Sequence, residues 1–167
     1  MNLRVKFQTL LCTFALSCLS SLSLAQAAWQ TYQNDPFSYS ISYPADLFNE
    51  PTPDKRQGGI TLDSVGGDAR LYIFGGVNRG RETTFSLAHG LAGLDEVHRV
   101  TYRRVADNWF VLSGYLAGSG DIFYERIELN ADRTFLAGFR LEYPSSLRQT
   151  FDHQIGRIGR SLTFDGR

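Results

Sequence analysis

The chain has 167 residues, with 17 lysines and arginines against 17 aspartates and glutamates, and a formal net charge of zero. Hydrophobic residues make up 43% of it, which is enough to bury the core of one domain. Because the charge is balanced and no basic run occurs, we expect binding neither to nucleic acid nor to an anionic membrane surface.

Residues 1–27 have the pattern of a secretory signal peptide. Arg4 and Lys6 form a basic start, an apolar stretch follows to about residue 24, and Ala25-Gln26-Ala27 fits the small-x-small cleavage pattern. We expect this segment to be removed before Ala28. An uncleaved membrane anchor is the alternative for such a stretch.

After cleavage, residues 28–167 are expected to form a single exported domain, periplasmic or extracellular, that is not inserted into a membrane. Loss of Arg4 and Lys6 leaves 15 basic residues against 17 acidic ones, a formal charge of −2. No apolar run in this part approaches the ~20 residues that a spanning helix needs.

Both cysteines, Cys12 and Cys18, lie in the predicted leader. The mature domain therefore has no disulfide, no thiolate metal site and no cysteine nucleophile. A lipid anchor on Cys18 would need a better match than Ala15-Leu16-Ser17 before it. The three histidines have no second ligand at helical spacing, so we predict no metal and no cofactor.

The first predicted element of the domain is a strand in "FSYSISYP". Phe37, Tyr39, Ile41 and Tyr43 alternate with serines, a period of two that indicates one packed and one polar face. Pro44 ends the strand because proline cannot donate to a ladder. We expect the apolar row to be a strip of the core, and the serine face near Ser40 to be covered by a second layer.

The remaining elements follow from periodicity and turn residues. Strands are predicted at 60–64, 70–75, 98–106, 109–116, 121–129 and 134–143. Helices are predicted from 83 or 84 to about 94, and after Pro144 to about 162 with a serine cap. The second helix carries one apolar stripe, which consists of Leu147, Phe151, Ile155, Ile158 and Leu162.

These elements predict an α+β fold: an antiparallel sheet of about six to seven strands flanked by two helices. The links between strands are too short for parallel crossovers, which need a dozen residues or more. The strand at 109–116 is apolar on both faces, which favours a central position with cover on two sides. Runs of strands with two helices favour helices on the faces of this sheet.

The order of these elements resembles the PsbP-like fold family. The resemblance rests on "FSYSISYP", on a helix after the third strand, on a meander of four strands, and on a last helix ending "IGRIGRSL". That family includes the extrinsic lumenal subunit of photosystem II and a nuclear-import regulator that binds the Ran GTPase. The resemblance implies a non-enzymatic binding or scaffolding module with a protein or cell-envelope partner, a PsbP-like α/β sandwich.

Aromatic residues are concentrated on two successive strands, 109–116 and 121–129. Facing outward, they would form a stacking platform for a glycan or a partner protein; facing inward, they would fill the core. Two arginines on adjacent predicted strands would supply the nearby positive charge. The candidate binding residues are therefore Trp109, Tyr115, Tyr124, Arg126 and Arg140.

No catalytic residue is predicted, and two alternatives to a binding module stay open. A small hydrolase of envelope polymers would need two carboxylates, for example Glu125 and Glu128. Such neighbours on a strand of alternating charge are also typical of a solvated sheet edge. The second alternative is a purely structural lumenal protein.

Overall fold

The computed structural model describes residues 28–165. The predicted leader, residues 1–27, lies outside the described residues. Within the described part, no helix is both long and apolar enough to cross a membrane.

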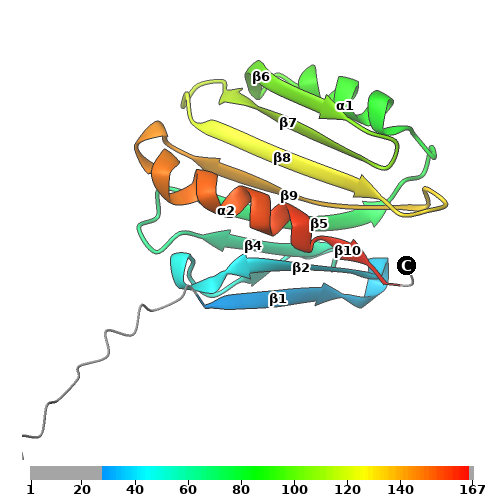
Figure 1. The fold of residues 1–167 in the computed structure, drawn as a ribbon, viewed down its shortest axis with the longest axis horizontal. Helices are drawn as coiled ribbons and strands as arrows, with labels where there is room; N and C mark the ends of the chain where they lie inside the picture. The colour runs from blue at the N-terminus through cyan, green and yellow to red at the C-terminus, as the bar shows by residue number, and fades with distance from the viewer. Residues whose placement is uncertain (1–27, 166–167) are drawn as a thin grey trace, which may run out of the picture.

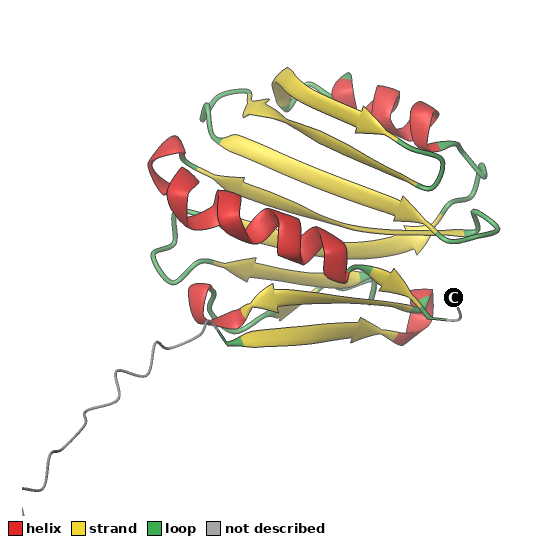
Figure 2. Ribbon diagram, viewed as in Figure 1, coloured by secondary structure: helices red, strands yellow, loops and turns green. Residues whose placement is uncertain are grey.

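The centre of the fold is a seven-stranded sheet in which every pair of neighbouring strands is antiparallel (Figures 1 and 2). The four strands between residues 97 and 143 form a meander because their connecting turns are too short for crossovers. This confirms the predicted α+β class. In spatial order the strands are β3 (Thr52–Pro53), β4 (Gly59–Asp63), β5 (Arg70–Val77), β9 (Phe135–Tyr143), β8 (Ile122–Leu129), β7 (Trp109–Leu116) and β6 (Val97–Val105).

A separate sheet of three strands contains the "FSYSISYP" segment. Its order is β1 (Trp29–Asn34), β2 (Tyr39–Pro44) and β10 (Thr163–Phe164). Phe37 lies not in the strand but in a 3₁₀ turn, Asp35–Phe37, and Ser38 adopts a left-handed conformation that ends the turn. The apolar side chains of β2 belong to the core, as predicted. The strand itself is not part of the large sheet; it packs onto that sheet as a member of the small one.

Helix α2 (Arg148–Ser161) lies beside the small sheet, and together they cover one face of the large sheet over β4, β5 and β9 (Figure 1). The predicted stripe of α2 is confirmed, since Phe151, Ile155 and Ile158 are buried. The predicted serine cap is wrong: Leu147 precedes the helix without a side-chain cap, because the two serines form a 3₁₀ turn, Ser145–Leu147.

Helix α1 (Thr84–Ala92) packs on the opposite face and at the opposite end of the sheet, against β6 and β7. Its N-cap is Thr83, whose hydroxyl accepts from the Ser86 amide at 3.2 Å. Beneath α1 lies a second core, which consists of Ala88, Phe110, Leu112, Phe123 and Ile127.

The sequence of β7 suggested a central position in the sheet, but the strand lies next to the edge strand β6. Its apolar residues on both faces are nevertheless buried: Phe110 beneath α1 is 0% exposed, and Val111 on the other side is 3% exposed. Because the two helices sit at opposite ends, each face of the sheet is covered at one end and open at the other (Figure 2).

The expectation of a covered serine face near Ser40 is wrong. The Ser40 hydroxyl lies 3.0 Å from the Thr163 hydroxyl in an exposed pair, and Ser42 pairs in the same way with Thr31 at 2.8 Å. Helix α2 lies beside β2 in the same layer and not above it, since the Ser161 hydroxyl accepts from the Ser42 amide. The small sheet thus has one core face and one outer face.

Candidate functional site

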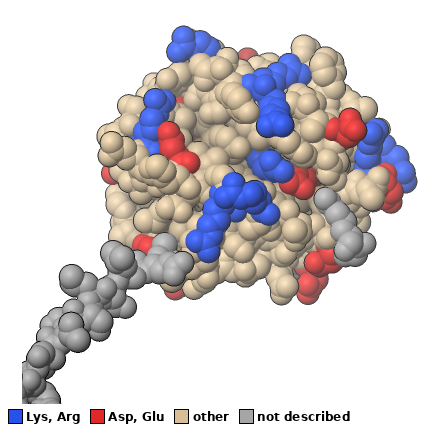
Figure 3. Space-filling view, in the orientation of Figure 1, with Lys and Arg blue, Asp and Glu red and all other residues tan. Residues whose placement is uncertain are grey.

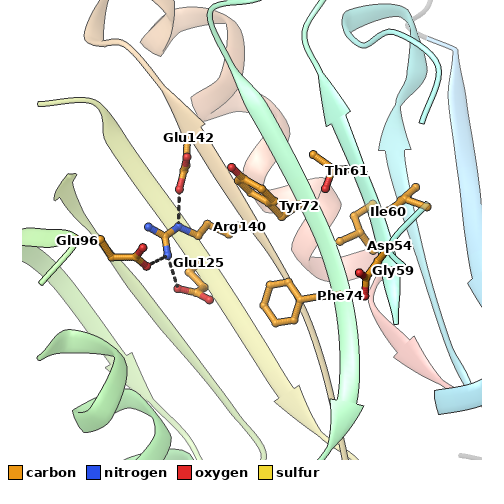
Figure 4. A pocket seen from close by; sticks show the side chains of 11 residues that line it. Asp54, Gly59, Ile60, Thr61, Tyr72, Phe74, Glu96, Glu125, Arg140 and Glu142 are labelled. Carbon is orange, nitrogen blue, oxygen red and sulfur yellow. Dashed lines mark hydrogen bonds and ion pairs between the residues drawn. The ribbon is translucent and has the colours of Figure 1, made fainter. Parts of the chain in front are cut away.

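A cleft of about 490 Å³ lies on the uncovered half of the α1 face of the large sheet (Figure 4). Its floor follows one row of residues paired across four strands: Glu125 on β8, Arg140 on β9, Tyr72 on β5 and Thr61 on β4. Residues paired in this way project to the same side of a sheet. The cleft is lined by Asp54, Gly59, Ile60, Thr61, Tyr72, Ile73, Phe74, Glu96, Glu125, Arg140 and Glu142.

One end of the cleft holds an arginine surrounded by three glutamates (Figure 4). The Arg140 Nη1 donates to Glu96 Oε1 at 2.7 Å and lies 3.9 Å from Glu125 Oε2. Its Nε lies 2.7 Å from Glu142 Oε1, an ion pair whose geometry is not that of a hydrogen bond. The guanidinium also lies 5.4 Å from the centre of the Phe123 ring.

Burial sets the protonation of this cluster. The side chain of Glu125 is 7% exposed, and this burial raises its pKa to about 7, although the charge of Arg140 opposes the rise. For Arg140 itself, burial lowers the pKa, but the hydrogen bond that it donates to Glu96 and the charges of Glu125 and Glu142 outweigh this effect and raise the pKa. Arg140 is therefore charged, and Glu125 gains or loses its proton near neutral pH.

The rest of the cleft is mostly apolar, with one further acidic group. Tyr72 and Phe74, both half-buried on β5, form the middle of the floor. Asp54 lies at the side opposite the glutamates (Figure 4). The cleft thus contains four carboxyl groups and one guanidinium, so it has negative net charge when the carboxyl groups are ionised.

This arrangement can attract and hold a cationic group, because carboxylates and aromatic faces both favour positive charge. Among the described residues, no group of histidine, cysteine, aspartate and glutamate side chains has the arrangement of a metal site. The pairing of Arg140 with the glutamates leaves Glu125 as the carboxyl with the loosest contact to the guanidinium.

Four of the five residues proposed from the sequence lie together, but on the other face of the sheet. Trp109, Tyr115 and Tyr124 are half-buried on the part of the α2 face that α2 leaves open, and Arg126 lies among them. The Arg126 guanidinium lies 4.4 Å from the centre of the Trp109 ring. Tyr124 stacks on Phe139 with ring centres 5.8 Å apart.

The side chains of these residues already make contacts with one another and with neighbouring residues. Arg126 donates from Nε to Glu128 Oε1 at 3.1 Å, and the backbone of Gly159 in α2 packs close to its side chain. Tyr115 lies under Arg99, whose guanidinium is 5.2 Å from the ring centre. A groove of about 330 Å³ beside α2 contains Tyr102 and Tyr124.

Arg140, the fifth proposed residue, lies in the cleft on the opposite face and does not join the aromatic group. Reasoning from the sequence missed its partners Glu96 and Glu142, and also the aromatic floor of Tyr72 and Phe74. Alternation along β9 places Glu142 on the same side as Arg140, so the contact between these two residues could have been predicted from the sequence. Glu96 is 44 positions from Arg140, and no local pattern links the two.

The carboxylate pair considered for hydrolysis, Glu125 and Glu128, cannot act on one bond. Three positions apart on β8, they project to opposite faces, since Glu125 lines the cleft and Glu128 binds Arg126 on the α2 face. The carboxyl groups that do lie near Glu125 are those of Glu96 and Glu142, which bind the same guanidinium as Glu125.

The face that carries α2 has its charged side chains in separate groups (Figure 3). Lysine and arginine side chains alternate there with uncharged surface and with a few acidic groups, and they do not merge into one basic patch in this view. In the cleft on the α1 face, by contrast, one arginine contacts three glutamates.

Comparison with known proteins supports the fold. No protein family profile matches the sequence, and no curated protein matches it. Among solved structures, the chain is similar to the solution structure of cyanobacterial PsbP (CyanoP) from Synechocystis sp. PCC 6803, with a TM-score of 0.58 and 14% sequence identity. The match covers 85% of this chain and 95% of that one. The chain thus has a PsbP-like fold, as its element order suggested.

Proposed function

We propose that this chain is an exported, non-catalytic binding module whose partner or ligand occupies the cleft above β4, β5, β9 and β8. The observation that carries the proposal is the Glu125 carboxyl, which is nearly buried yet faces a cleft, in a row with Arg140 and Tyr72. Desolvating a carboxyl costs free energy, so a structure built only for stability gains little from placing one there.

Two further observations support this function. Residues 1–27 have the signal-peptide pattern, which would deliver the module to the periplasm or the extracellular space. The PsbP-like fold is the second, because the resemblance implies a module that acts by contact with a protein or envelope component.

A second candidate is a small hydrolase, and the raised pKa of Glu125 favours it. A carboxyl group with a pKa of about 7 can act as a general acid, and other carboxylates lie in the same cleft. Against it, Arg140 occupies the space between Glu96 and Glu142, so neither carboxylate is free to activate water. Hydrolysis of an envelope polymer that is lost in Glu125→Gln would decide for the enzyme.

The proposed function is tested by blocking the cleft. Thr61 is half-buried in the cleft floor, so Thr61→Arg fills the cleft with a long cationic side chain. Thr150→Arg makes the same change on the exposed surface of α2, on the other face of the sheet. Residues 28–167 of each form are immobilised and exposed to an envelope extract and to culture fluid, and retained components are identified by mass spectrometry.

We expect a component that the wild-type domain and Thr150→Arg retain and that Thr61→Arg does not. Thermal unfolding of all three proteins establishes that the variants are folded. Equal retention by Thr61→Arg would show that binding does not use the cleft. Retention of nothing by any form would favour the purely structural protein.

A further inference from the structure

The two ends of the cleft carry acidic groups, and the middle is apolar and aromatic. We propose that its ligand is a linear aliphatic diamine or polyamine. One ammonium group binds between Glu125 and Glu96, the other binds Asp54, and the carbon chain lies across Tyr72 and Phe74. This inference rests on the proposed function, because it names the class of ligand for the same cleft.

The first ammonium site is the end with the glutamates. Arg140 carries one positive charge among three carboxyl groups, so this end has a surplus of negative charge when they are ionised. Within residues 28–165, the Glu125 carboxyl accepts no hydrogen bond, and the 3.9 Å ion pair with Arg140 is longer than a hydrogen bond. It therefore has free acceptor capacity, nearly buried and open to the cleft.

The second ammonium site is Asp54, beyond the opposite end of the floor. Two backbone hydrogen bonds hold this residue in place: its amide donates to the Gly59 carbonyl at 2.9 Å, and its carbonyl accepts from Gln57 at 3.0 Å. Its carboxylate lies over Gly58, near the point where a side chain there would begin. In the described part of the chain, the Asp54 side chain forms no ion pair.

The floor between the two ends suits an alkyl chain. Tyr72 and Phe74 present aromatic surface, and both side chains are half-buried. Methylene groups gain free energy when they leave water for such a surface, about 0.8 kcal/mol for each fully buried CH₂. An ammonium group in the middle of a triamine would also be attracted to the ring faces.

Sheet geometry sets the length of the ligand. From Glu125 on β8 the paired row passes through Arg140 and Tyr72 to Thr61, three steps between neighbouring strands. With neighbouring strands about 4.8 Å apart, the row is roughly 14 Å long, and the acidic side chains reach inward from its ends. A monoamine can satisfy only one end, and a triamine in an extended conformation spans more of the row than a short diamine.

Isothermal titration calorimetry with residues 28–167 tests this inference at about 150 mM salt, where weak surface attraction is screened. The probes are spermidine, cadaverine and butylamine. We expect spermidine to bind more tightly than cadaverine, and butylamine to show no saturable binding. Glu125→Gln and Asp54→Asn should each weaken spermidine binding about tenfold, because each removes one of the two charge contacts.

The matched control is Asp152→Asn, the same kind of change on α2 over the opposite face. It should leave spermidine affinity unchanged. Equal binding of butylamine and spermidine, equal loss in Asp152→Asn, or no saturable binding to wild type would each overturn the diamine inference. If wild type ignores the amines but still loses its captured component in Thr61→Arg, this inference fails while the proposed function stands.

Discussion

Arg140 on β9 and Glu125 on β8 are directly paired neighbours in the antiparallel register, and the Arg140 Nη1 lies 3.9 Å from Glu125 Oε2. The pair is largely buried, since the two side chains are 12% and 7% exposed. The same guanidinium binds Glu96 and Glu142, so one positive charge compensates three carboxyl groups. The stability of this half of the sheet therefore depends on Arg140.

Replacement of Arg140 by methionine should destabilise the domain by about 3 kcal/mol, because the nearly buried Glu125 carboxyl loses the positive charge beside it and Glu96 and Glu142 lose their ion pairs. Urea unfolding followed by tryptophan fluorescence measures the change. The control is Arg70→Met, which breaks the pair with Asp63, where both side chains are about half exposed. That pair should contribute less than about 1 kcal/mol. Similar losses in both variants would mean that the Arg140 cluster is solvated.

The second prediction concerns pH. Burial raises the pKa of Glu125 from an ordinary value near 4.5 to about 7, so the folded chain holds this proton more tightly than the unfolded chain. The resulting stability is fully present below about pH 4.5 and is lost as the pH rises through about 7. The loss should be about 3 kcal/mol. In Glu125→Gln this part of the pH dependence should be absent, as measured by urea unfolding at a series of pH values; an unchanged profile would contradict the burial of the carboxyl.

The third prediction concerns the approach of β2 to β5. A Cβ added at Gly75 would lie 2.4 Å from the ring of Tyr39, which is fully buried and donates its hydroxyl to the Gly58 carbonyl at 2.8 Å. Gly75→Ala should therefore cost about 1–3 kcal/mol. At the next position, Gly76, no atom lies within 4 Å of the added Cβ. Gly76→Ala should be close to neutral, and equal thermal unfolding temperatures for the two variants would show that the ring can move away.

The sequence predicted those features of the fold that depend on residues close together in the chain. The alternation in "FSYSISYP" correctly identified a core face, with Tyr39 and Ile41 fully buried. It could not show that β2 belongs to a separate sheet, because the strand pairs with β1 and with β10, which begins at Thr163, more than a hundred residues later. Periodicity defines the faces of an element, whereas pairing requires contacts distant in sequence.

For the candidate site, too, the sequence predicted groups of residues better than contacts between distant strands. The aromatic residues of β7 and β8 were recognised as a group, and Trp109, Tyr115 and Tyr124 do share a face. Arg140 was assigned to that group because its strand is adjacent, yet adjacency does not decide the side on which a residue lies. The register pairs Arg140 with Glu125 and pairs Arg126 with Phe139, so the two arginines point in opposite directions.

The fourth prediction tests the docking of α2. Ile158 is fully buried in the stripe of this helix, so Ile158→Ala should leave a cavity that costs about 2–4 kcal/mol. Arg157 is exposed and lies over Trp29, with its guanidinium 3.9 Å from the ring centre. Arg157→Ala should cost no more than about 1 kcal/mol. Equal shifts of the midpoint in urea titrations would mean that α2 does not pack by this face.

The fifth prediction concerns processing. Exported protein should begin at Ala28 and carry no lipid, because the cleavage pattern ends at Ala27 and the residues before Cys18 match a lipobox poorly. N-terminal sequencing and intact mass of the exported protein measure this. A mature chain that begins with a lipid-modified Cys18 would instead place the protein on a membrane surface.

The most direct test of the cleft as a cation-binding site is amide shift mapping by NMR, with isotope-labelled residues 28–167 titrated with spermidine. We expect saturable shifts confined to the cleft, above all at Thr61, Tyr72, Phe74, Glu96 and Arg140, and saturation in Glu125→Gln only at about tenfold higher spermidine concentration. Shifts confined to the aromatic face around Trp109 and Tyr124, or no saturable shift on either face, would contradict this expectation.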